Sequence, residues 1–306
     1  MARYIIKRLI NAFVVVIAVS VLVFVLTRAV GNPINVMLPL DAPQAERIAL
    51  AHQLGIDRPL WVQFLSYSDG VLHGSFGNSW WQGIPAMTVV GQRLPITLKL
   101  TFYAFLIAII FGIPLGMLAA LRPRSWLDKL ASTSSMLGIS IPNFWLGLML
   151  ILVFAQKLHW FYTSGLGDWR HWVLPAVALG VLPLGRITQV VRTEMLEQLR
   201  EMYVVTARSK GLAEWLVVSR HALKNAGIAV VTMSAWEIGR MIAGYTVVIE
   251  VVFGVSGLGD LIVDTIAHMD YPLLQAITFV VASFISLLNL VTDLTYPLFN
   301  PRVKFE

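Results

Sequence analysis

Charged residues are scarce in this 306-residue chain, and cysteine is absent. Asp, Glu, Lys and Arg make up 13% of the residues, against about 25% in typical soluble domains, while hydrophobic residues reach 57%. The absence of cysteine excludes a disulfide framework, a thiol nucleophile and a cysteine metal cluster. The chain also lacks the GxxxxGK(S/T), HExxH and GxSxG patterns, which excludes a phosphate loop of that type and the two hydrolase signatures.

Histidine and glycine likewise show no spacing that indicates a catalytic or metal site. The histidines that lack any ligand pattern are His52, His73, His159, His171, His221 and His268. Gly254, Gly257 and Gly259 of GVSGLGD do not have GxGxxG spacing and instead predict an external turn that leads into a short helix. The sequence therefore predicts no enzyme and no cofactor bound by this chain.

Long apolar runs are what the chain has instead. The first lies between Arg8 and Arg28 and exceeds the roughly 7–15 residues of a signal-peptide hydrophobic region, so it predicts a retained helix. Further runs, each long enough to cross a hydrocarbon layer of about 30 Å, cover residues 94–121, 134–158, 172–191, 226–252 and 273–296. The sequence predicts an all-α integral membrane protein with six transmembrane helices.

Lysine and arginine are distributed unevenly between the two sides that six spans define. The side of the N-terminus carries Arg3, Lys7, Arg8, Arg122, Arg124, Lys129, Arg192, Arg200, Arg208, Lys210, Arg220, Lys224, Arg302 and Lys304. The opposite loops carry Arg47, Arg58, Arg93 and Arg170, with Lys157 at a boundary. Because basic residues favour the cytoplasmic side, both termini and the 192–225 loop are predicted to be cytoplasmic. The same dispersal argues against a nucleic-acid partner, despite the net charge of +6.

This topology divides the chain into three parts. Residues 1–29 form an N-terminal transmembrane helix, residues 30–93 an extracytoplasmic segment, and residues 94–306 a five-helix core. The 30–93 segment has apolar residues at helical spacing, glycine and proline punctuation and no spanning run, so it predicts a small helical element.

Polar and ionisable residues inside the expected spans are candidates for function, because their burial in lipid is costly. Glu237 and Arg240 are three residues apart and can pair on one helical face. Glu250 and Asn143 are the other candidates, and Asp293 lies near the inner end of the last span. Two interpretations stay open: a polar lining or gate of a translocation path, or contacts that fix helix packing.

The basic stretch VVTARSKGLAEWLVVSRHALKN, residues 204–225, stands out in so apolar a chain. The preceding TEMLEQLREMYVVTA predicts a charged amphipathic helix that ends at Gly211, and helical spacing resumes beyond it. Two interpretations fit this helix, glycine break and helix equally well. One is a surface helix on anionic lipid, and the other is a docking element for a partner protein.

The same stretch resembles the coupling motif of the dipeptide, oligopeptide and nickel permeases, the membrane subunits of ATP-binding-cassette importers. That motif in its broader form is Glu-Ala-Ala followed four residues later by Gly. Ala207 and Gly211 match the second alanine and the glycine, while Val205 stands where glutamate would be and Thr206 replaces the first alanine. The resemblance extends to segments 4–8, 54–59, 74–79, 138–151, 220–232, 248–261, 270–272 and 300–302.

Three positions depart from the family pattern. Ser256 stands where proline usually precedes Gly-Leu-Gly, Ala229 where proline usually follows the HALKN-like segment, and Met202 where aspartate often precedes the tyrosine. These differences affect turn stiffness or a helix cap and leave the resemblance in place.

The resemblance implies a type I importer in the bacterial inner membrane. A second, homologous permease subunit would complete the pore, two cytoplasmic ATPase subunits would carry ATP and magnesium, and an extracytoplasmic binding protein would deliver the substrate. The segment 203–225 would contact an ATPase through Tyr203, Thr206, Ala207, Arg208, Lys210, Gly211, Leu212, Arg220, His221 and Asn225.

Short peptides are the substrates that the resemblance favours, and the pore would carry them by alternating access. Nickel or another small solute is the alternative within the family. A channel or secondary carrier that works without an ATPase is the alternative from another class, although the absence of a visible internal repeat weakens it.

Overall fold

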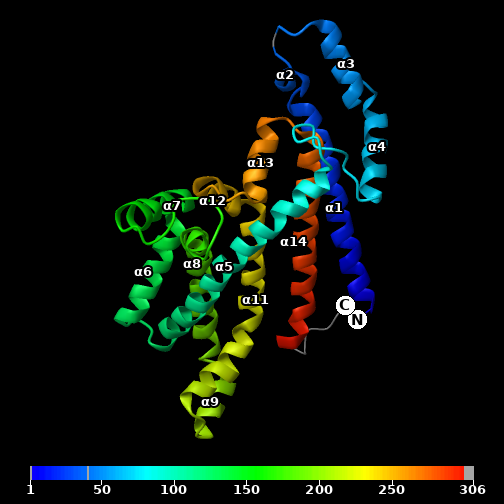
Figure 1. The fold of residues 1–306 in the computed structure, drawn as a ribbon. Coiled ribbons are helices and arrows are strands. Elements are labelled where there is room, and N and C mark those ends of the chain that lie inside the picture. The colour runs from blue at the N-terminus through cyan, green and yellow to red at the C-terminus, as the bar shows by residue number, and fades with distance from the viewer. Residues whose placement is uncertain (1, 40, 300–306) are drawn as a thin grey trace.

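The computed structural model describes residues 2–39 and 41–299, and this part of the chain is helical without a named strand. Figure 1 shows a bundle of long helices with a small helical element at one end and a short helical projection at the other. The helices of the first half are α1 (Ala2–Val30), α2 (Ile34–Met37), α3 (Gln44–Leu54), α4 (Leu60–Leu72), α5 (Ala86–Leu121), α6 (Trp126–Ser140), α7 (Asn143–Leu150) and a π-helical continuation, η1 (Ile151–Lys157). The all-α membrane fold predicted from the apolar runs is confirmed.

The second half is built around α8 (Arg170–Gln198), α9 (Met202–Ser209) and one long composite helix. That composite helix runs from Glu214 to Phe253 and consists of α10 (Glu214–Leu216), η2 (Val217–Ala222), α11 (Leu223–Arg240), η3 (Met241–Tyr245) and α12 (Thr246–Phe253). The last two helices are α13 (Leu258–Ala267) and α14 (Tyr271–Phe299).

Five helical segments of the described chain are long and apolar enough to cross a membrane: Ile6–Ala29, Ala86–Leu121, Arg170–Gln198, Glu214–Phe253 and Tyr271–Thr295. The expected third span is different, because α6 and the α7–η1 helix meet at an angle of 101°. Pro142 lies at this bend, and Ile141 before it is extended, with ψ of 124°. A residue before proline is pushed out of the helical region, which explains the break. Counting the bent pair as one span gives the six that were expected.

The 30–93 segment contains α2, α3 and α4, and its last residues belong to the start of α5. Gly55, with φ of 67°, ends α3, and Pro59 directly precedes α4. In Figure 1, α2 and α3 lie beyond the end of α1, and α4 runs beside α1, where Phe64 and Tyr67 contact Phe24. The helical character expected for this segment is therefore present.

The centre of the bundle is the contact between α5 and α8. A side chain at Gly180 of α8 would bring its Cβ to 2.7 Å from the carbonyl oxygen of Ala104 on α5, so the two backbones approach closely. Small residues at such contacts are what allow membrane helices to pack without a hydrophobic driving force between them. Surrounding side chains bury Leu100, Leu179 and Phe253 in the same core.

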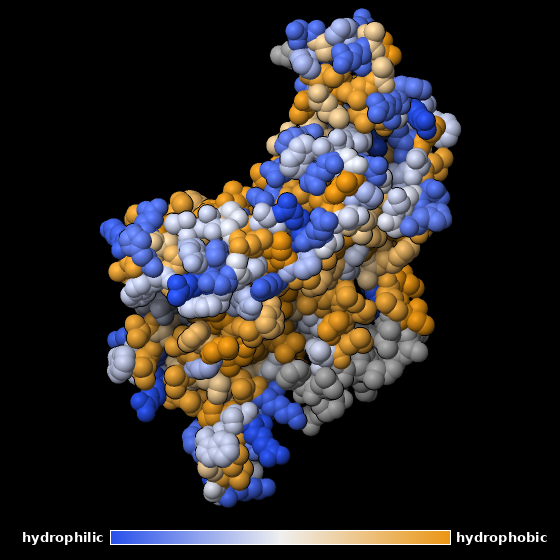
Figure 2. Space-filling model, in the orientation of Figure 1, coloured by the Kyte–Doolittle hydropathy of each residue, from blue (hydrophilic) through white to orange (hydrophobic). Residues whose placement is uncertain are grey.

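Figure 2 shows how polar and apolar surface are arranged on this framework. A broad apolar band covers the middle of the long helices, and polar side chains gather on the α2–α4 element and at the tip formed by α9. This pattern is what a multi-spanning protein presents to a hydrocarbon layer and to the water on either side of it.

Candidate functional site

The coupling segment, residues 203–225, begins at the end of the molecule farthest from α3. In Figure 1 its α9 helix projects beyond the other helices, and the beginning of α1 and the end of α14 point toward this same end. The preceding turn separates α8 from α9, so the charged helix expected over residues 193–207 is in fact split. Its first residues extend α8, because the apolar spacing of that helix continues without interruption to Gln198.

Gly211 ends α9 in the manner that the sequence predicted. Its φ is 74°, a left-handed value that residues with a Cβ rarely adopt. In this conformation its N–H donates to the carbonyl of Arg208 at 2.9 Å, and the N–H of Leu212 donates to the carbonyl of Ala207 at 3.4 Å. These two bonds satisfy the last carbonyl groups of the helix and turn the chain toward α10. The spacing of Ala207 and Gly211 therefore has a local structural reason.

Ala207 itself is buried inside the segment. It packs with Val204 of α9 and Val217 of η2, and Tyr203 covers the same small core. The hydroxyl of Tyr203 donates to Oε1 of Gln198 at 2.7 Å, which ties α9 to the end of α8. Tyr203 and Ala207 therefore hold the coupling segment together, because their side chains are directed to its interior.

The other predicted coupling residues lie at the surface. Thr206, Arg208, Lys210, Gly211, Leu212, Arg220 and Asn225 are exposed, and His221 is half-buried. Arg208 forms an ion pair with Glu214 at 2.6 Å across the glycine turn, and this hydrogen bond raises the pKa of Arg208. Met202, Val205 and Trp215 add exposed apolar surface that the sequence analysis did not assign to docking. Basic groups and apolar side chains thus share the exposed face of the segment.

The predicted pair of Glu237 and Arg240 is present, and a third charge joins it. Nη1 of Arg240 donates to Oε1 of Glu237 at 2.8 Å, and Nη1 of Arg186 on α8 donates to the same oxygen at 3.0 Å. The hydroxyl of Tyr245 accepts a second bond from Arg186 at 3.0 Å. We call these four residues, Arg186, Glu237, Arg240 and Tyr245, the midspan cluster.

Glu250 has a different geometry. It is fully buried, its Oε1 accepts from the hydroxyl of Thr97 at 2.6 Å, and its Oε2 accepts from the backbone N–H groups of Gly259 at 2.7 Å and Asp260 at 3.1 Å. These N–H groups belong to the first turn of α13, so Glu250 caps that helix from α12. Gly254 and Gly257 form the predicted turn before a short helix, whereas Gly259 already lies in that helix, and the geometry favours the packing interpretation for Glu250.

Asn143 begins α7 directly after the bend at Pro142. It lines a cavity of about 280 Å³ together with Pro142, Gly244 and Tyr245. Tyr245 also belongs to the midspan cluster, through its bond with Arg186, so this one residue joins the cavity at Asn143 to the cluster. Three of the four predicted path candidates, Asn143, Glu237 and Arg240, thus belong to the cavity or the adjoining cluster, whereas Glu250 bonds to Thr97 and α13.

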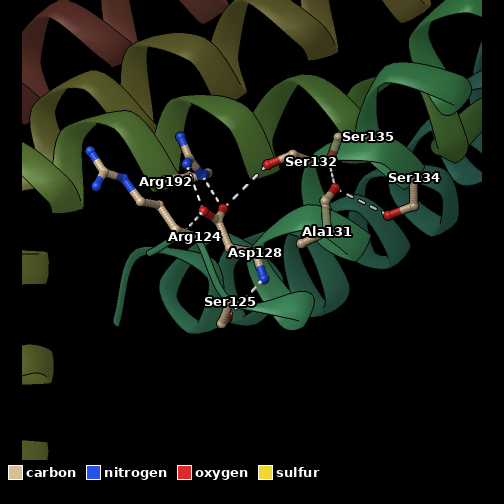
Figure 3. A network of polar contacts seen from close by, with 8 residues as sticks. All are labelled: Arg124, Ser125, Asp128, Ala131, Ser132, Ser134, Ser135 and Arg192. Carbon is tan, nitrogen blue, oxygen red and sulfur yellow. Dashed lines mark hydrogen bonds and ion pairs between the residues drawn. The ribbon is translucent and has the colours of Figure 1, made fainter. Parts of the chain in front are cut away.

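Two further charged residues, which were not singled out from the sequence, form a close ion pair with two hydrogen bonds. In Figure 3, Asp128 of α6 points toward Arg192 of α8. Nε of Arg192 donates to Oδ1 at 2.5 Å and Nη2 to Oδ2 at 2.9 Å, and the backbone N–H of Arg124 also donates to Oδ2 at 2.8 Å. Ser125, whose hydroxyl accepts from the N–H of Asp128, caps the start of α6. We call the pair of Asp128 and Arg192 the α6–α8 clamp.

The sequence carried a signal for only part of these contacts. Ser125 followed by Asp128 is a recognisable helix start, whereas Arg186 and Arg192 have partners 51 and 64 residues away. Within the described residues no group of three or more His, Cys, Asp or Glu side chains could hold a metal ion.

Residues 112–305 match the family described as binding-protein-dependent transport system inner membrane component, and residues 1–101 match the corresponding N-terminal family. The glutathione transport system permease protein GsiC of Salmonella typhimurium is 37% identical over 308 residues, which is 100% of both chains. A probable peptide ABC transporter permease protein of Sinorhizobium fredii is 36% identical over 314 residues, again 100% of both. The inward-facing MetNI methionine ABC transporter has a similar fold, with 19% identity, a TM-score of 0.60, and coverage of 70% of this chain and 97% of that one.

Proposed function

The chain belongs to the family of inner-membrane components of binding-protein-dependent transport systems, and from this premise we propose that it forms half of the pore of an ATP-driven importer of short peptides. As a permease subunit of an ABC importer it is a transport protein of the inner membrane, and such permeases work with ATPase and binding-protein partners. A second, homologous permease would form the other half of the pore, and two ATPase subunits would bind ATP and magnesium.

One observation carries the proposal, namely the continuity between the coupling segment and the midspan cluster. α9 and the Gly211 turn lead into α10, and α10 is the beginning of the helix that runs unbroken from Glu214 to Phe253. Glu237 and Arg240 lie on that helix. A movement of α9 and the Gly211 turn is therefore passed to the helix that carries these charged side chains, and no loop interrupts that helix between Glu214 and Arg240.

The physical requirement on such a lever is differential binding. ATP changes the arrangement of the pore only if the ATPases hold the coupling segment more tightly in one arrangement than in the other. The buried contacts of Val204, Ala207 and Val217 keep α9 and η2 together, so the segment moves as one body. The exposed basic and apolar side chains on its outer face supply contact area for the ATPase.

Support for the cytoplasmic position of this segment comes from the excess of lysine and arginine on its side of the spans. Support for peptides as substrates comes from the relatives, which are named for the transport of glutathione and of peptides. The extracytoplasmic binding protein would load the substrate at the opposite end, where α2, α3 and α4 lie.

The test reconstitutes this permease with its partner permease, ATPases and binding protein in proteoliposomes. Gly211→Val imposes a strained φ at the turn, and Ala207→Arg forces a charge into the core of the segment. We expect each variant to lose about tenfold of the ATPase stimulation by loaded binding protein, which corresponds to about 1.4 kcal/mol. Gly165→Val is the matched control, since Gly165 also has a left-handed φ, 92°, and lies between η1 and α8, outside the α2–α4 element.

Stimulation that survives in Gly211→Val and Ala207→Arg at the wild-type level would contradict the coupling role. The same preparation separates the alternatives. A channel or secondary carrier would pass substrate in liposomes that contain this chain alone, and a nickel permease would take up Ni²⁺ and not peptide.

A further inference from the structure

The midspan cluster lies deep in the apolar band. Arg186 is 16 residues from the start of α8, about 24 Å at about 1.5 Å per residue, and Arg240 is 13 residues before the end of α12, about 20 Å. Their side chains are 26% and 38% exposed, whereas Glu237 is completely buried. Because an arginine open to hydrocarbon is strongly unfavourable, this face of α8 and α11 is covered by water or protein and not by lipid tails.

The charges of the cluster do not balance. Arg186 and Arg240 share Glu237, and no other carboxylate of the described residues lies within 4.0 Å of either guanidinium. Both arginines also bond to the same oxygen, Oε1, through Nη1 alone. One positive charge is left over, together with several N–H donors that have no hydrogen-bond partner among the described residues.

The surroundings of the free donors are aromatic and partly apolar. The guanidinium of Arg240 lies 5.5 Å from the ring centroid of Trp236, which is 59% exposed. On the other side Tyr245 borders the cavity of about 280 Å³ that Asn143 also lines. Planar guanidinium forks beside an aromatic ring suit a carboxylate that is carried by an apolar molecule.

We propose that Arg186 and Arg240 form a binding station for the carboxylate of the transported molecule, with the free C-terminal carboxylate of a short peptide as the expected ligand. The proposal rests on the proposed function, because it requires this face of α8 and α11 to line the pore. Glu237 is the positioning residue: it holds both arginines and neutralises one of them. The remaining single charge attracts a carboxylate and still allows it to leave, which a transport path requires.

The experiment uses the complete transporter in proteoliposomes and measures both peptide uptake and ATP hydrolysis. Its probes are one short peptide with a free C-terminal carboxylate and the same peptide with a C-terminal amide, each at a concentration that saturates the binding protein. The test variant is Arg240→Gln, which keeps a polar N–H donor on a shorter side chain and removes the charge. Arg240→Lys restores the charge, and Arg122→Gln removes an exposed arginine outside the cluster.

In Arg240→Gln we expect uptake of the free-acid peptide to fall about tenfold per ATP hydrolysed, while ATPase stimulation by loaded binding protein stays within twofold of wild type. Uptake of the amide should be low in wild type and unchanged by the substitution. Arg240→Lys should recover at least half of the lost uptake, and Arg122→Gln should behave as wild type. A purely structural role for Arg240 would lower uptake of both peptides equally.

Three results would overturn the proposal. One is equal uptake of the free acid and the amide in wild type, with no change between them in Arg240→Gln. Another is loss of co-purification with the partner permease in Arg240→Gln, which would assign the surplus charge to a carboxylate of that subunit. A wild-type transporter that carries no peptide at all would refute the proposed function first and the carboxylate station with it.

Discussion

Two charged clusters lie on α8 six residues apart, about 9 Å along the helix, and they are built on opposite principles. In the α6–α8 clamp, one arginine meets one carboxylate through two parallel bonds, and both oxygens of Asp128 have donors. In the midspan cluster, two arginines meet one oxygen of Glu237, while its Oε2 has no hydrogen-bond partner among the described residues. The one-to-one pair of the clamp holds two helices together. The two-to-one pairing of the midspan cluster leaves N–H donors available for a ligand.

The position of each cluster agrees with this difference. The clamp joins the start of α6 to α8 (Figure 3), six residues before α8 ends at Gln198. It joins the bent third span to α8, the helix that precedes the coupling segment. Glu237 and Arg240 of the midspan cluster lie on the helix that continues from the coupling segment. A movement of that helix would therefore displace the side chains that we propose bind the substrate.

Asp128→Ala should have the largest effect on stability. It leaves Arg192, whose side chain is 30% exposed, without its partner and also removes the acceptor for the N–H of Arg124. Loss of one partner of such a pair costs about 3 kcal/mol. Thermal unfolding of the purified transporter in detergent should show a clear drop in the midpoint. Ser132→Ala is the control, because its hydroxyl lies 3.4 Å from the carboxylate and contributes little.

An unchanged midpoint in Asp128→Ala would mean that the bidentate pair does not hold α6 to α8. The α6–α8 clamp could then no longer be contrasted with the midspan cluster as a contact that stabilises the fold.

Glu237→Gln should have the next largest effect, about 2 kcal/mol, because hydrogen bonds from both arginines would then go to a neutral acceptor. The two guanidiniums would also repel each other more strongly. If the cluster binds carboxylates, a free-acid peptide should raise the unfolding midpoint of this variant more than that of wild type, and the amide should not.

Equal effects of acid and amide on Glu237→Gln would contradict a charge-based site. A stability loss as large as that of Asp128→Ala with no response to ligand would make the midspan cluster a second clamp.

The sequence predicted the elements well where the signal is local. Apolar runs located the spans, the glycine at 211 located the end of α9, and the three-residue spacing of Glu237 and Arg240 located their contact. Each of these depends on residues within one helical turn, so periodicity and backbone conformation decide it.

The contacts between helices could not be predicted in the same way. Apolar spacing does not say which faces meet when every helix is apolar around most of its circumference, so the partners of Arg186 and Arg192 stayed hidden. The sequence also does not show which prolines break a helix. α5 continues through Pro95 and Pro114, whereas the chain bends by 101° at Pro142. Whether a proline breaks a helix depends on which neighbours satisfy the freed backbone groups, and these neighbours are far away in the sequence.

Tyr245→Phe tests the role of Arg186 separately from that of Arg240. The hydroxyl accepts from Arg186 and from no other arginine of the described residues, so its removal should cost about 1 kcal/mol of stability. Arg186 would then bond only to Glu237, and the affinity for a carboxylate should rise slightly through its freed donor. The KM for uptake of the free-acid peptide measures this. A raised KM would show that the hydroxyl itself contacts the substrate.

A further ion pair, Arg208 with Glu214, tests whether burial or pairing geometry explains the difference between the clamp and the midspan cluster. It resembles the clamp in being a one-to-one pair with two hydrogen bonds, at 3.1 and 2.6 Å, but its side chains are 42% and 55% exposed. Glu214→Gln should therefore cost less than about 0.5 kcal/mol, since water screens the charges and replaces the lost bond. ATPase stimulation by loaded binding protein should stay within twofold of wild type. Gly211→Val, which is expected to lose this stimulation, is assayed beside it for comparison. A loss comparable to that of Asp128→Ala would mean that pairing geometry, and not burial, sets the strength of these contacts.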